Sequence, residues 1–270
     1  MSLLRLKHED SRRIVVLVLL VCGISALGSL ISLTLALTIF LVLALSGIFL
    51  LIAHYQRASE EDRIQQSQDI QDLQFIQSTL DLRRPLPYFT RWSSSPALAA
   101  QLIGVIKVYQ PRCVLELGSG VSTVVVAMAL RDQGSGQITS VDHDPVYAEK
   151  TRKELAAQDL LSWSTVHDAP LVQTQTPRGT VPYYDMAMLD ELGPIDLLIV
   201  DAPPRHSCKD ARLPAFELLK ERLAPGALVV LDDTAREDES ASVAAWLSAA
   251  RDNASRIVPC RKGVTIVRMP

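Results

Sequence analysis

The chain has 270 residues and a formal net charge of −3, from 27 Lys and Arg against 30 Asp and Glu. This length suits one catalytic domain with an additional segment. The near-neutral charge gives no electrostatic reason to expect a nucleic-acid partner, and we expect none. Apolar residues make up 48% of the chain, and no residue between Ile14 and Ala53 is charged.

This uncharged segment is about twice as long as the roughly 20 residues that a spanning helix needs. A softer patch of glycine and serine divides it, which predicts a transmembrane helical hairpin over residues 13–54, with helices at about 13–30 and 34–54. Basic residues flank the segment on both sides, so both flanks are expected in the cytoplasm under the positive-inside rule. The patch consists of Gly23, Gly28, Ser29 and Ser32, and the flanking residues are Arg5, Lys7, Arg12, Arg13, Arg57 and Arg63.

We therefore predict an integral protein of a bacterial-type inner or plasma membrane, with residues 1–12 as a cytoplasmic tail and the catalytic domain also in the cytoplasm. A cleaved signal peptide is less favoured, because its apolar core would be far shorter. A buried hairpin of a soluble protein is less favoured still, because a charge-free segment of this length is typical of membrane spans.

The cysteines are far apart in the sequence and form no CxxC pair. This spacing favours reduced thiols in a cytosolic domain over a disulfide framework or a zinc site. The four residues are Cys22, Cys113, Cys208 and Cys260.

A polar segment at residues 55–84 carries apolar side chains at helical spacing, which predicts a helical stalk that continues from the second span. Its stripe could pair with a second copy as a short coiled coil, giving a homo-oligomer through hairpin and stalk, or it could pack on the catalytic domain. Pro85 and Pro87 end this helix, so we place the catalytic domain at residues 85–270. The stripe consists of Ile70, Leu73, Ile76 and Leu80.

Within this domain, Ser93, Ser94 and Ser95 before Pro96 predict an N-cap and a first helix at residues 96–109. Apolar runs of strand length then alternate with helix-like segments. This alternation predicts an α/β fold, a Rossmann-like, doubly wound, mostly parallel sheet of seven strands. Two final strands without a helix between them predict a C-terminal β-hairpin. The expected strands are residues 113–117, 137–142, 164–167, 195–201, 227–232, 256–259 and 263–269, and the expected helices are 121–132, 145–158, 210–223 and 237–252.

The ends of the predicted strands carry either a glycine turn or a carboxylate. Gly118 and Gly120 follow the first strand, Asp142 ends the second, and Asp168 follows the third; Asp201 ends the fourth, and Asp232 with Asp233 ends the fifth. In such sheets ligands bind beyond the carboxyl ends of the strands. We therefore expect the ligand site at this edge.

Two motifs carry a resemblance to a known family: Val114-Leu115-Glu116-Leu117-Gly118-Ser119-Gly120 and Ser140-Val141-Asp142-His143-Asp144-Pro145. They resemble the first two motifs of class I S-adenosylmethionine-dependent methyltransferases. The resemblance covers about residues 96–269. It is strongest to a bacterial group of poorly defined substrate, and more distant to catechol-type O-methyltransferases. The group's further motifs are echoed by Asp201-Ala202-Pro203-Pro204, Leu213-Pro214-Ala215 and Leu231-Asp232-Asp233-Thr234-Ala235-Arg236.

The resemblance implies S-adenosylmethionine as cofactor and a set of residues around it. Glu116 and the loop of Gly118, Ser119 and Gly120 would hold the methionine part. Asp142 would bind the ribose hydroxyls, with His143 beside it, and Asp168 and Ala169 would flank the adenine. The alternative for Asp142 is a helix cap before Pro145.

Three carboxylates, those of Asp201, Asp232 and Asp233, suit a hard divalent ion such as Mg²⁺. The resemblance implies the same, because the matching positions of catechol-type O-methyltransferases bind such an ion. The chain departs from that pattern at Asp233, where an amide is usual, and at Pro204, where a basic residue is expected. The alternative is that Asp232 and Asp233 cap the next helix and Asp201 only borders the substrate.

Among the catalytic candidates, His206 is proposed as general base, because an unperturbed imidazole titrates near neutral pH. It could equally be an exposed loop histidine. Asp201 is the second candidate. Arg212 and Arg236 could bind an acidic substrate group or pair with nearby carboxylates. A loop with Tyr183, Tyr184 and Asp185 could cover the substrate.

The sequence therefore predicts a membrane-anchored methyltransferase that methylates an oxygen of a small or lipid-linked substrate, with a divalent metal as an option. Three alternatives stay open. One is a non-catalytic membrane scaffold with a methyltransferase-like domain. The second is aminopropyl transfer on the same fold, and the third and least favoured is nicotinamide-dependent redox chemistry.

Overall fold

The computed structural model describes residues 8–28, 33–89, 94–187, 191–250, 255–258 and 260–270. The chain divides into two compact units, Met1–Ile64 and Gln65–Pro270. The finer division at residues 12, 54 and 84 stays a prediction. The four cysteines are free thiols.

The first unit contains helix α1 (His8–Gly28) and the first part of α2 (Leu33–Thr79). Large apolar side chains lie exposed along both helices, as at Leu19 and Phe49. Among the described residues, one helix, Leu37–Thr79, is long and apolar enough to cross a membrane, with a mean hydropathy of 2.5 in an apolar window that is 0% buried. The turn predicted between the two helices lies at residues outside the described ranges.

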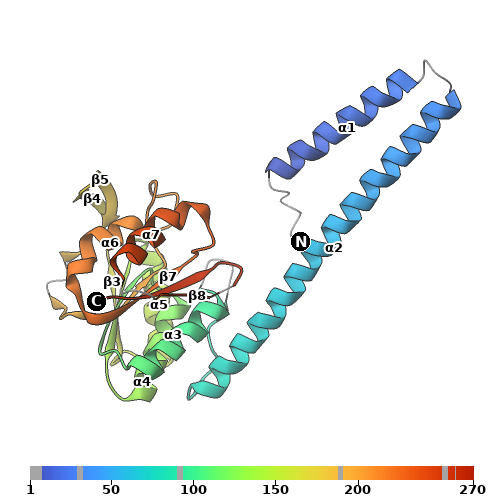
Figure 1. Cartoon of the computed structure of the whole chain (residues 1–270). Helices are drawn as coiled ribbons and strands as arrows, with labels where there is room; N and C mark the ends of the chain where they lie inside the picture. Colours follow the sequence, from blue (N-terminus) through green and yellow to red (C-terminus); the bar gives the residue numbers. More distant parts are fainter. Residues whose placement is uncertain (1–7, 29–32, 90–93, 188–190, 251–254, 259) are drawn as a thin grey trace. The chain divides into compact units, whose positions relative to one another are not determined.

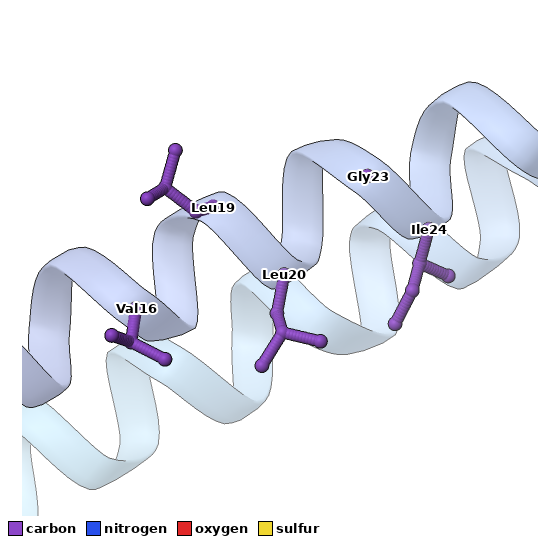
Figure 2. Close-up of a pocket in the computed structure, with 5 residues that line it drawn as sticks. All are labelled: Val16, Leu19, Leu20, Gly23 and Ile24. Atoms are coloured by element: carbon purple, nitrogen blue, oxygen red, sulfur yellow. The ribbon is translucent and has the colours of Figure 1, made fainter.

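Helix α1 presents an apolar surface. Figure 2 shows Val16, Leu20 and Ile24, spaced four residues apart, pointing to the same side, while Leu19 points away. This spacing is that of one helix face. An open hollow of about 410 Å³ beside them is lined by Val16, Leu19, Leu20, Gly23 and Ile24 alone, so it offers no side chain that binds a polar ligand.

The end of α2 belongs to the second unit and is packed into it. Ile76 and Leu80 are buried in an apolar cluster, and Leu73 packs against that cluster. The side-chain oxygen Oε1 of Gln65 accepts a hydrogen bond of 2.9 Å from the backbone N–H of Arg261. Of the two options that the apolar stripe left open, the structure thus shows packing on the catalytic unit. Ile70, the remaining member of the stripe, is exposed.

The second unit is built on a seven-stranded sheet with the order β3-β2-β1-β6-β7-β9-β8. Figure 1 shows the helices of this unit packed around the sheet. The first five strands in this order are parallel, and β9 is antiparallel to both β7 and β8. This confirms the mostly parallel, Rossmann-like sheet and its C-terminal hairpin. The strands are β1 (Cys113–Leu117), β2 (Gln137–Asp142), β3 (Ser164–Asp168), β6 (Ile195–Val200), β7 (Leu223–Asp232), β8 (Ser255–Val258) and β9 (Val264–Arg268).

Helices cover the sheet and bury an apolar cluster on each face. Helix α3 begins as predicted: Ser95 is its N-cap and accepts a hydrogen bond of 3.1 Å from Leu98 N, whereas Ser93 lies outside the described residues. The helices are α3 (Pro96–Tyr109), α4 (Val121–Gln133), α5 (Pro145–Ala157), α6 (Leu213–Leu219) and α7 (Ser240–Ala249), with short 3₁₀ turns η2 (Lys220–Arg222) and η3 (Glu237–Glu239).

Two helices are shorter than the sequence predicts. The segment expected as a helix from residue 210 becomes helical only at Leu213, and it ends at Leu219 before the 3₁₀ turn. Pro214 explains the start, because proline fits the first turn of a helix and not its interior. Likewise the last helix starts at Ser240, and residues 251–252 of that prediction lie outside the described ranges.

A second, two-stranded sheet lies between β3 and β6 in the sequence and was not predicted. Strands β4 (Leu171–Thr176) and β5 (Gly179–Tyr184) form an antiparallel hairpin. The polar residues of β4 hide the strand, because they give no alternation of apolar side chains. The prediction of a loop at Tyr183 and Tyr184 is therefore wrong: both residues end a strand, and both are buried.

Candidate active site

The ends of β1, β2, β6 and β7 meet at one edge of the large sheet. Leu117 pairs with Val141 on one side and with Val200 on the other, and Val200 pairs with Leu231. The residues that follow these positions therefore lie next to each other. They are Gly118, Asp142, Asp201 and Asp232.

The turn after β1 requires glycine at one position. Gly118 has a φ of 100°, and a Cβ atom there would lie 2.6 Å from the Cβ of Ala202 in the loop after β6. Gly120 differs, because its φ of 169° is extended backbone and a Cβ would meet nothing within 4 Å. Gly118 thus brings the β1 turn and the β6 loop into close approach.

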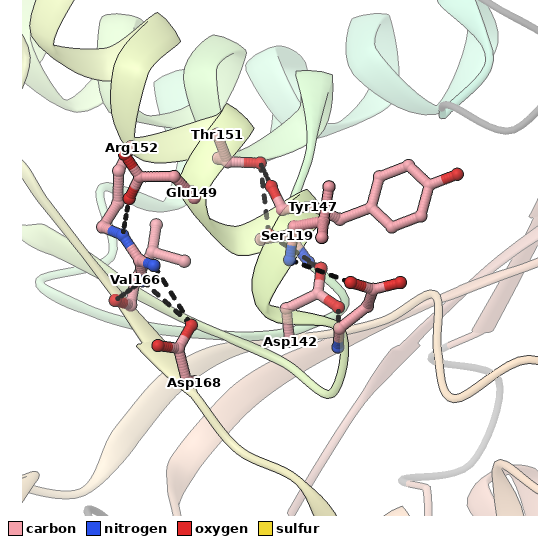
Figure 3. A network of polar contacts seen from close by, with 10 residues as sticks. Ser119, Asp142, Tyr147, Glu149, Thr151, Arg152, Val166 and Asp168 are labelled. Atoms are coloured by element: carbon pink, nitrogen blue, oxygen red, sulfur yellow. Dashed lines mark hydrogen bonds and ion pairs between the residues drawn. The ribbon is translucent and has the colours of Figure 1, made fainter.

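The carboxylate of Asp142 is held by the same turn (Figure 3). Its Oδ2 accepts hydrogen bonds from Ser119 N at 3.1 Å and from Ser119 Oγ at 2.8 Å, and its Oδ1 accepts one from Asp144 N at 3.0 Å. The N-cap of α5 is Asp144, which accepts from Val146 N at 2.8 Å. Asp142 is therefore not the helix cap, and its side chain is fixed at the end of β2.

Glu116 lies fully buried below this turn. Its Oε2 accepts hydrogen bonds from Thr123 Oγ1 at 2.5 Å and from Ser140 Oγ, whereas Oε1 has no hydrogen-bond partner among the described residues. Burial raises the pKa of Glu116 to about 7, although the hydrogen bonds from Ser140 and Thr123 lower it in part. Glu116 can therefore carry a proton near neutral pH.

The three remaining cofactor candidates have different surroundings. Asp168 is half exposed, and its Oδ1 accepts hydrogen bonds from Arg152 at 3.1 and 3.2 Å (Figure 3). Ala169 is buried, and its N–H donates to Asp142 O at 2.7 Å. His143 places Nδ1 3.5 Å from Asp142 Oδ1, and its ring lies edge-on to Tyr184 with centroids 6.2 Å apart.

An acidic cluster forms where β6 and β7 end. One carboxylate oxygen from each of Asp201, Asp232 and Asp233 lies within 4.8 Å of the others. Neither oxygen of Asp232 accepts a hydrogen bond from a donor group among the described residues. Burial raises the pKa of Asp232 well above its ordinary value, and the charges of Asp201 and Asp233 raise it further. Burial also raises the pKa of Asp201.

Arg212 is the buried counter-ion of this cluster. Its Nη2 lies 2.8 Å from Asp233 Oδ2 and 3.4 Å from Asp201 Oδ1, and its Nε lies 3.4 Å from Glu239 Oε1. The guanidinium also donates to the backbone oxygens of Asp232, at 2.8 Å, and of Asp201. Of the two roles left open for Arg212, the structure thus shows pairing with carboxylates.

Arg236 pairs in the same way, because its Nη1 lies 2.8 Å from Asp233 Oδ2. The capping alternative for Asp232 and Asp233 is not observed, since the N-caps are Arg236 for η3 and Glu239 for α7. Asp233 has a φ of 60°, which aspartate tolerates better than most residues.

The cluster fits a hard divalent ion by its donor set. All its ligand atoms are carboxylate oxygens, which such ions prefer. Both oxygens of Asp232 and Oδ1 of Asp233 are buried and accept no hydrogen bond within the described part of the chain. Arg212 already neutralises part of the negative charge of the cluster, so the three carboxylates do not depend on a cation to lie together.

His206 lies away from these contacts. The residue is exposed on the loop after β6. No hydrogen bond or ion pair joins it to Asp201 or to another described residue. The structure therefore does not bring the predicted base and the acidic cluster together.

Several residues around the site were not assigned these contacts from the sequence. Thr123 and Ser140 bind Glu116, and Thr151 Oγ1 lies 3.2 Å from Ser119 Oγ. Tyr184, expected in a loop that could cover the substrate, is buried beside His143. The serines and threonines that follow Glu116 and end the second strand were a usable signal, since a buried carboxylate needs donors. Nothing local signals Tyr184, because it comes from the unpredicted hairpin.

Comparison with known proteins supports the fold. Residues 115–234 match the family model described as a methyltransferase domain. The fold is similar to that of an O-methyltransferase from Bacillus cereus solved with SAH, at 17% identity, a TM-score of 0.50, and coverage of 76% of this chain and 91% of that one. It is also similar to an SAH-bound methyltransferase of Podospora anserina, at 16% identity, a TM-score of 0.50, and coverage of 75% and 87%. No curated protein matches the sequence.

The sheet order, the glycine turn and the matched domain together define the class of protein. Residues 115–234 are the domain of a class I S-adenosylmethionine-dependent methyltransferase. The protein is therefore an enzyme of this class, as its motifs indicate.

Proposed function

We propose that the protein is a membrane-anchored O-methyltransferase that acts on a small or lipid-linked acceptor. The observation that carries the proposal is the meeting of three features at one edge of the sheet: the Gly118 turn, the fixed carboxylate of Asp142, and the acidic cluster of Asp201, Asp232 and Asp233. The glycine turn and the Asp142 carboxylate suit an adenosine-containing cofactor. The acidic cluster suits the methyl acceptor.

The proposed cofactor contacts come from residues at the rim of the site, the edge of the large sheet where β1, β2, β6 and β7 end. The backbone of Gly118, Ser119 and Gly120, with Glu116 below it, binds the methionine part. Asp142 binds the ribose, beside His143. Ala169 and the backbone of Asp168 flank the adenine. The Asp168 carboxylate itself accepts a hydrogen bond from Arg152.

For the reaction, S-adenosylmethionine supplies an electrophilic methyl group, so the protein must align an acceptor oxygen and remove its proton. Alignment alone can lower the barrier by about 7–11 kcal/mol. Asp201 is the proposed group beside the acceptor, because its side chain is the least buried of the acidic cluster. His206, exposed on the loop after β6, remains a candidate base.

A divalent ion such as Mg²⁺, when bound, would orient the acceptor hydroxyl and make it more acidic. Asp201, Asp232 and Asp233 would hold it. Arg212 and Arg236 keep Asp233 in place by ion pairs on its Oδ2, and its Oδ1 stays available.

Membrane anchoring rests on the uncharged segment and on the exposed apolar side chains of α1 and of the first part of α2. In this proposal residues 13–54 anchor the enzyme in a bacterial-type membrane and the catalytic unit is cytoplasmic. An anchored enzyme meets acceptors at the membrane surface, which favours a lipid-linked substrate. The relative from Bacillus cereus is described as an O-methyltransferase, which favours oxygen as the methylated atom. A homo-oligomer through the hairpin is also proposed.

The test is calorimetric titration of S-adenosylmethionine into the full chain in detergent, with and without Mg²⁺. Asp142→Ala removes the ribose carboxylate, so we expect its affinity to fall at least tenfold, about 1.4 kcal/mol or more. Asp168→Ala is the matched control, because Arg152 already holds that carboxylate, and its affinity should change little.

Two results of this titration would contradict parts of the proposal. A folded wild-type chain that binds no S-adenosylmethionine would refute the proposed cofactor site. Equal affinity for S-adenosylmethionine with and without Mg²⁺ would remove the metal from the proposal and leave the methyltransferase in place.

A further inference from the structure

Tyr184 is a buried phenol at the rim whose hydroxyl is unpaired. It is the last residue of β5 and is 1% exposed. Its Oη has no hydrogen-bond partner among the described residues. Buried hydroxyls of native proteins nearly always have a partner, so one that lacks a protein partner points to a ligand or an ordered water.

The ring of Tyr184 lies at the cofactor end of the site. Tyr184 belongs to the same buried apolar cluster as Leu117, Val141 and Val200, the residues that directly precede Gly118, Asp142 and Asp201. The ring also lies edge-on to His143, the neighbour of Asp142, at 6.2 Å between centroids and an angle of 67°.

Burial, with the nearby carboxylates, keeps the hydroxyl of Tyr184 protonated. Burial raises the pKa of Tyr184 well above its ordinary value, and the charges of Asp142 and Asp201 raise it further. The group is therefore a neutral O–H that can both donate and accept a hydrogen bond.

The ribose needs such a group. A carboxylate offers about four lone-pair sites. Ser119 N, Ser119 Oγ and Asp144 N already occupy three of those on Asp142. One site is too few for the two ribose hydroxyls of the cofactor, so a second polar group nearby has to serve the other.

We propose that the hydroxyl of Tyr184 is this second group, a cofactor-binding residue that hydrogen-bonds the ribose of S-adenosylmethionine. The inference rests on the proposed cofactor site. It gives the β4–β5 hairpin a role in binding, because Tyr184 is the last residue of that hairpin and its ring lies beside His143.

Tyr184→Phe tests the proposal in the full chain in detergent, since it removes one oxygen and keeps the ring. We expect the affinity for S-adenosylmethionine to fall about tenfold by calorimetry, while the thermal unfolding midpoint without ligand stays the same or rises. Tyr183→Phe is the matched control. Tyr183 is also fully buried with an unpaired Oη and stacks edge-on against Tyr184 at 5.5 Å, but its charged neighbour is Arg212. Its affinity should equal that of the wild type.

A second readout locates the contact on the cofactor. Adenosine carries the ribose without the methionine part, so Tyr184→Phe should weaken adenosine by a similar factor and leave competition by methionine unchanged. Unchanged binding of both S-adenosylmethionine and adenosine by Tyr184→Phe, beside a wild type that binds them, would overturn the inference. Equal losses in both variants would overturn it too, because ring packing would then be the cause. A wild type that binds no cofactor would instead refute the proposed function.

Discussion

Two glycines of the turn after β1 have different physical reasons to be glycine. Gly118 has a positive φ and lies against Ala202, so a side chain there meets both a backbone penalty and a clash. Gly120 has extended backbone and open space around its Cα. The openness at Gly120 suits the close approach of a ligand to the backbone.

Gly118→Ala is expected to destabilise the fold by about 1–3 kcal/mol, because alanine is strained at this φ and its Cβ would push Ala202 away. Gly120→Ala is the control and should change the free energy of unfolding little. Chemical denaturation of both full-length variants in detergent measures the difference. Equal stabilities would show that the β1 turn and the β6 loop do not approach as closely as the structure has them.

Arg212 shows how a residue can be noticed in the sequence without its role being fixed. The sequence left it either a substrate contact or a partner of carboxylates. The structure places it, 4% exposed, between the ends of β6 and β7, bound to both their side chains and their backbone oxygens. Burial alone would lower the pKa of Arg212, but Asp201, Glu239 and Asp233 raise it more, so it stays charged.

At the scale of elements, the end of α2 is part of the catalytic unit. Ile76 and Leu80 are buried in its core, so a fragment starting at the predicted boundary, residue 85, would lack part of that core. The apolar spacing predicted the helix, because helical periodicity is local. It did not select the partner of the stripe, because that choice depends on surfaces formed by distant residues such as those of α3 and α4.

Two isoleucines of α2 test this packing. Ile76 is 0% exposed, whereas Ile70 is 56% exposed. Ile76→Ala should lower the free energy of unfolding by about 2–5 kcal/mol, the usual cost of a cavity in a core. Ile70→Ala should change it by about 0.5 kcal/mol or less. The comparison is made on the full chain by chemical denaturation in detergent, and a larger loss at Ile70 would favour the coiled-coil interpretation.

The β4–β5 hairpin is the element that the sequence missed. Its first strand is polar and largely exposed, so its pattern lacks the apolar run that marked the strands of the central sheet. Its pairing is nevertheless regular, from Leu171 with Tyr184 to Thr176 with Gly179. Because the hairpin was missed, Tyr184 was expected in a loop that could cover the substrate, whereas it is buried in the core.

At the scale of the whole molecule, the proposal makes a prediction about topology. An even number of spans puts both ends of the chain on the same, cytoplasmic side, as the basic flanks indicate. Tags at the N- and C-termini should therefore both be cleaved by protease in inverted vesicles and both be protected in spheroplasts. The chain should also stay with the lipid after an alkaline wash.

Tags that are cleaved on opposite sides would leave a single span, formed by α2 alone. Release by the wash would contradict membrane insertion. Neither result would alter the identification of the methyltransferase domain, which rests on the matched residues and the sheet.

The sequence by itself determined the parts of this protein that follow from local pattern. Buried parallel strands are largely apolar on both faces. In this chain such strands end in, or are followed by, a glycine or an acid, so β1, β2, β6 and β7 and the residues at their ends could be predicted from the sequence. The same holds for the Ser95 cap, the long α2 helix and the class of enzyme. The tertiary structure decided which groups meet. The pairing of Arg212 with Asp201 and Asp233, the burial of Tyr184 beside His143, and the packing of Ile76 all join residues far apart in the chain, and no local pattern encodes such contacts because they depend on how the elements pack.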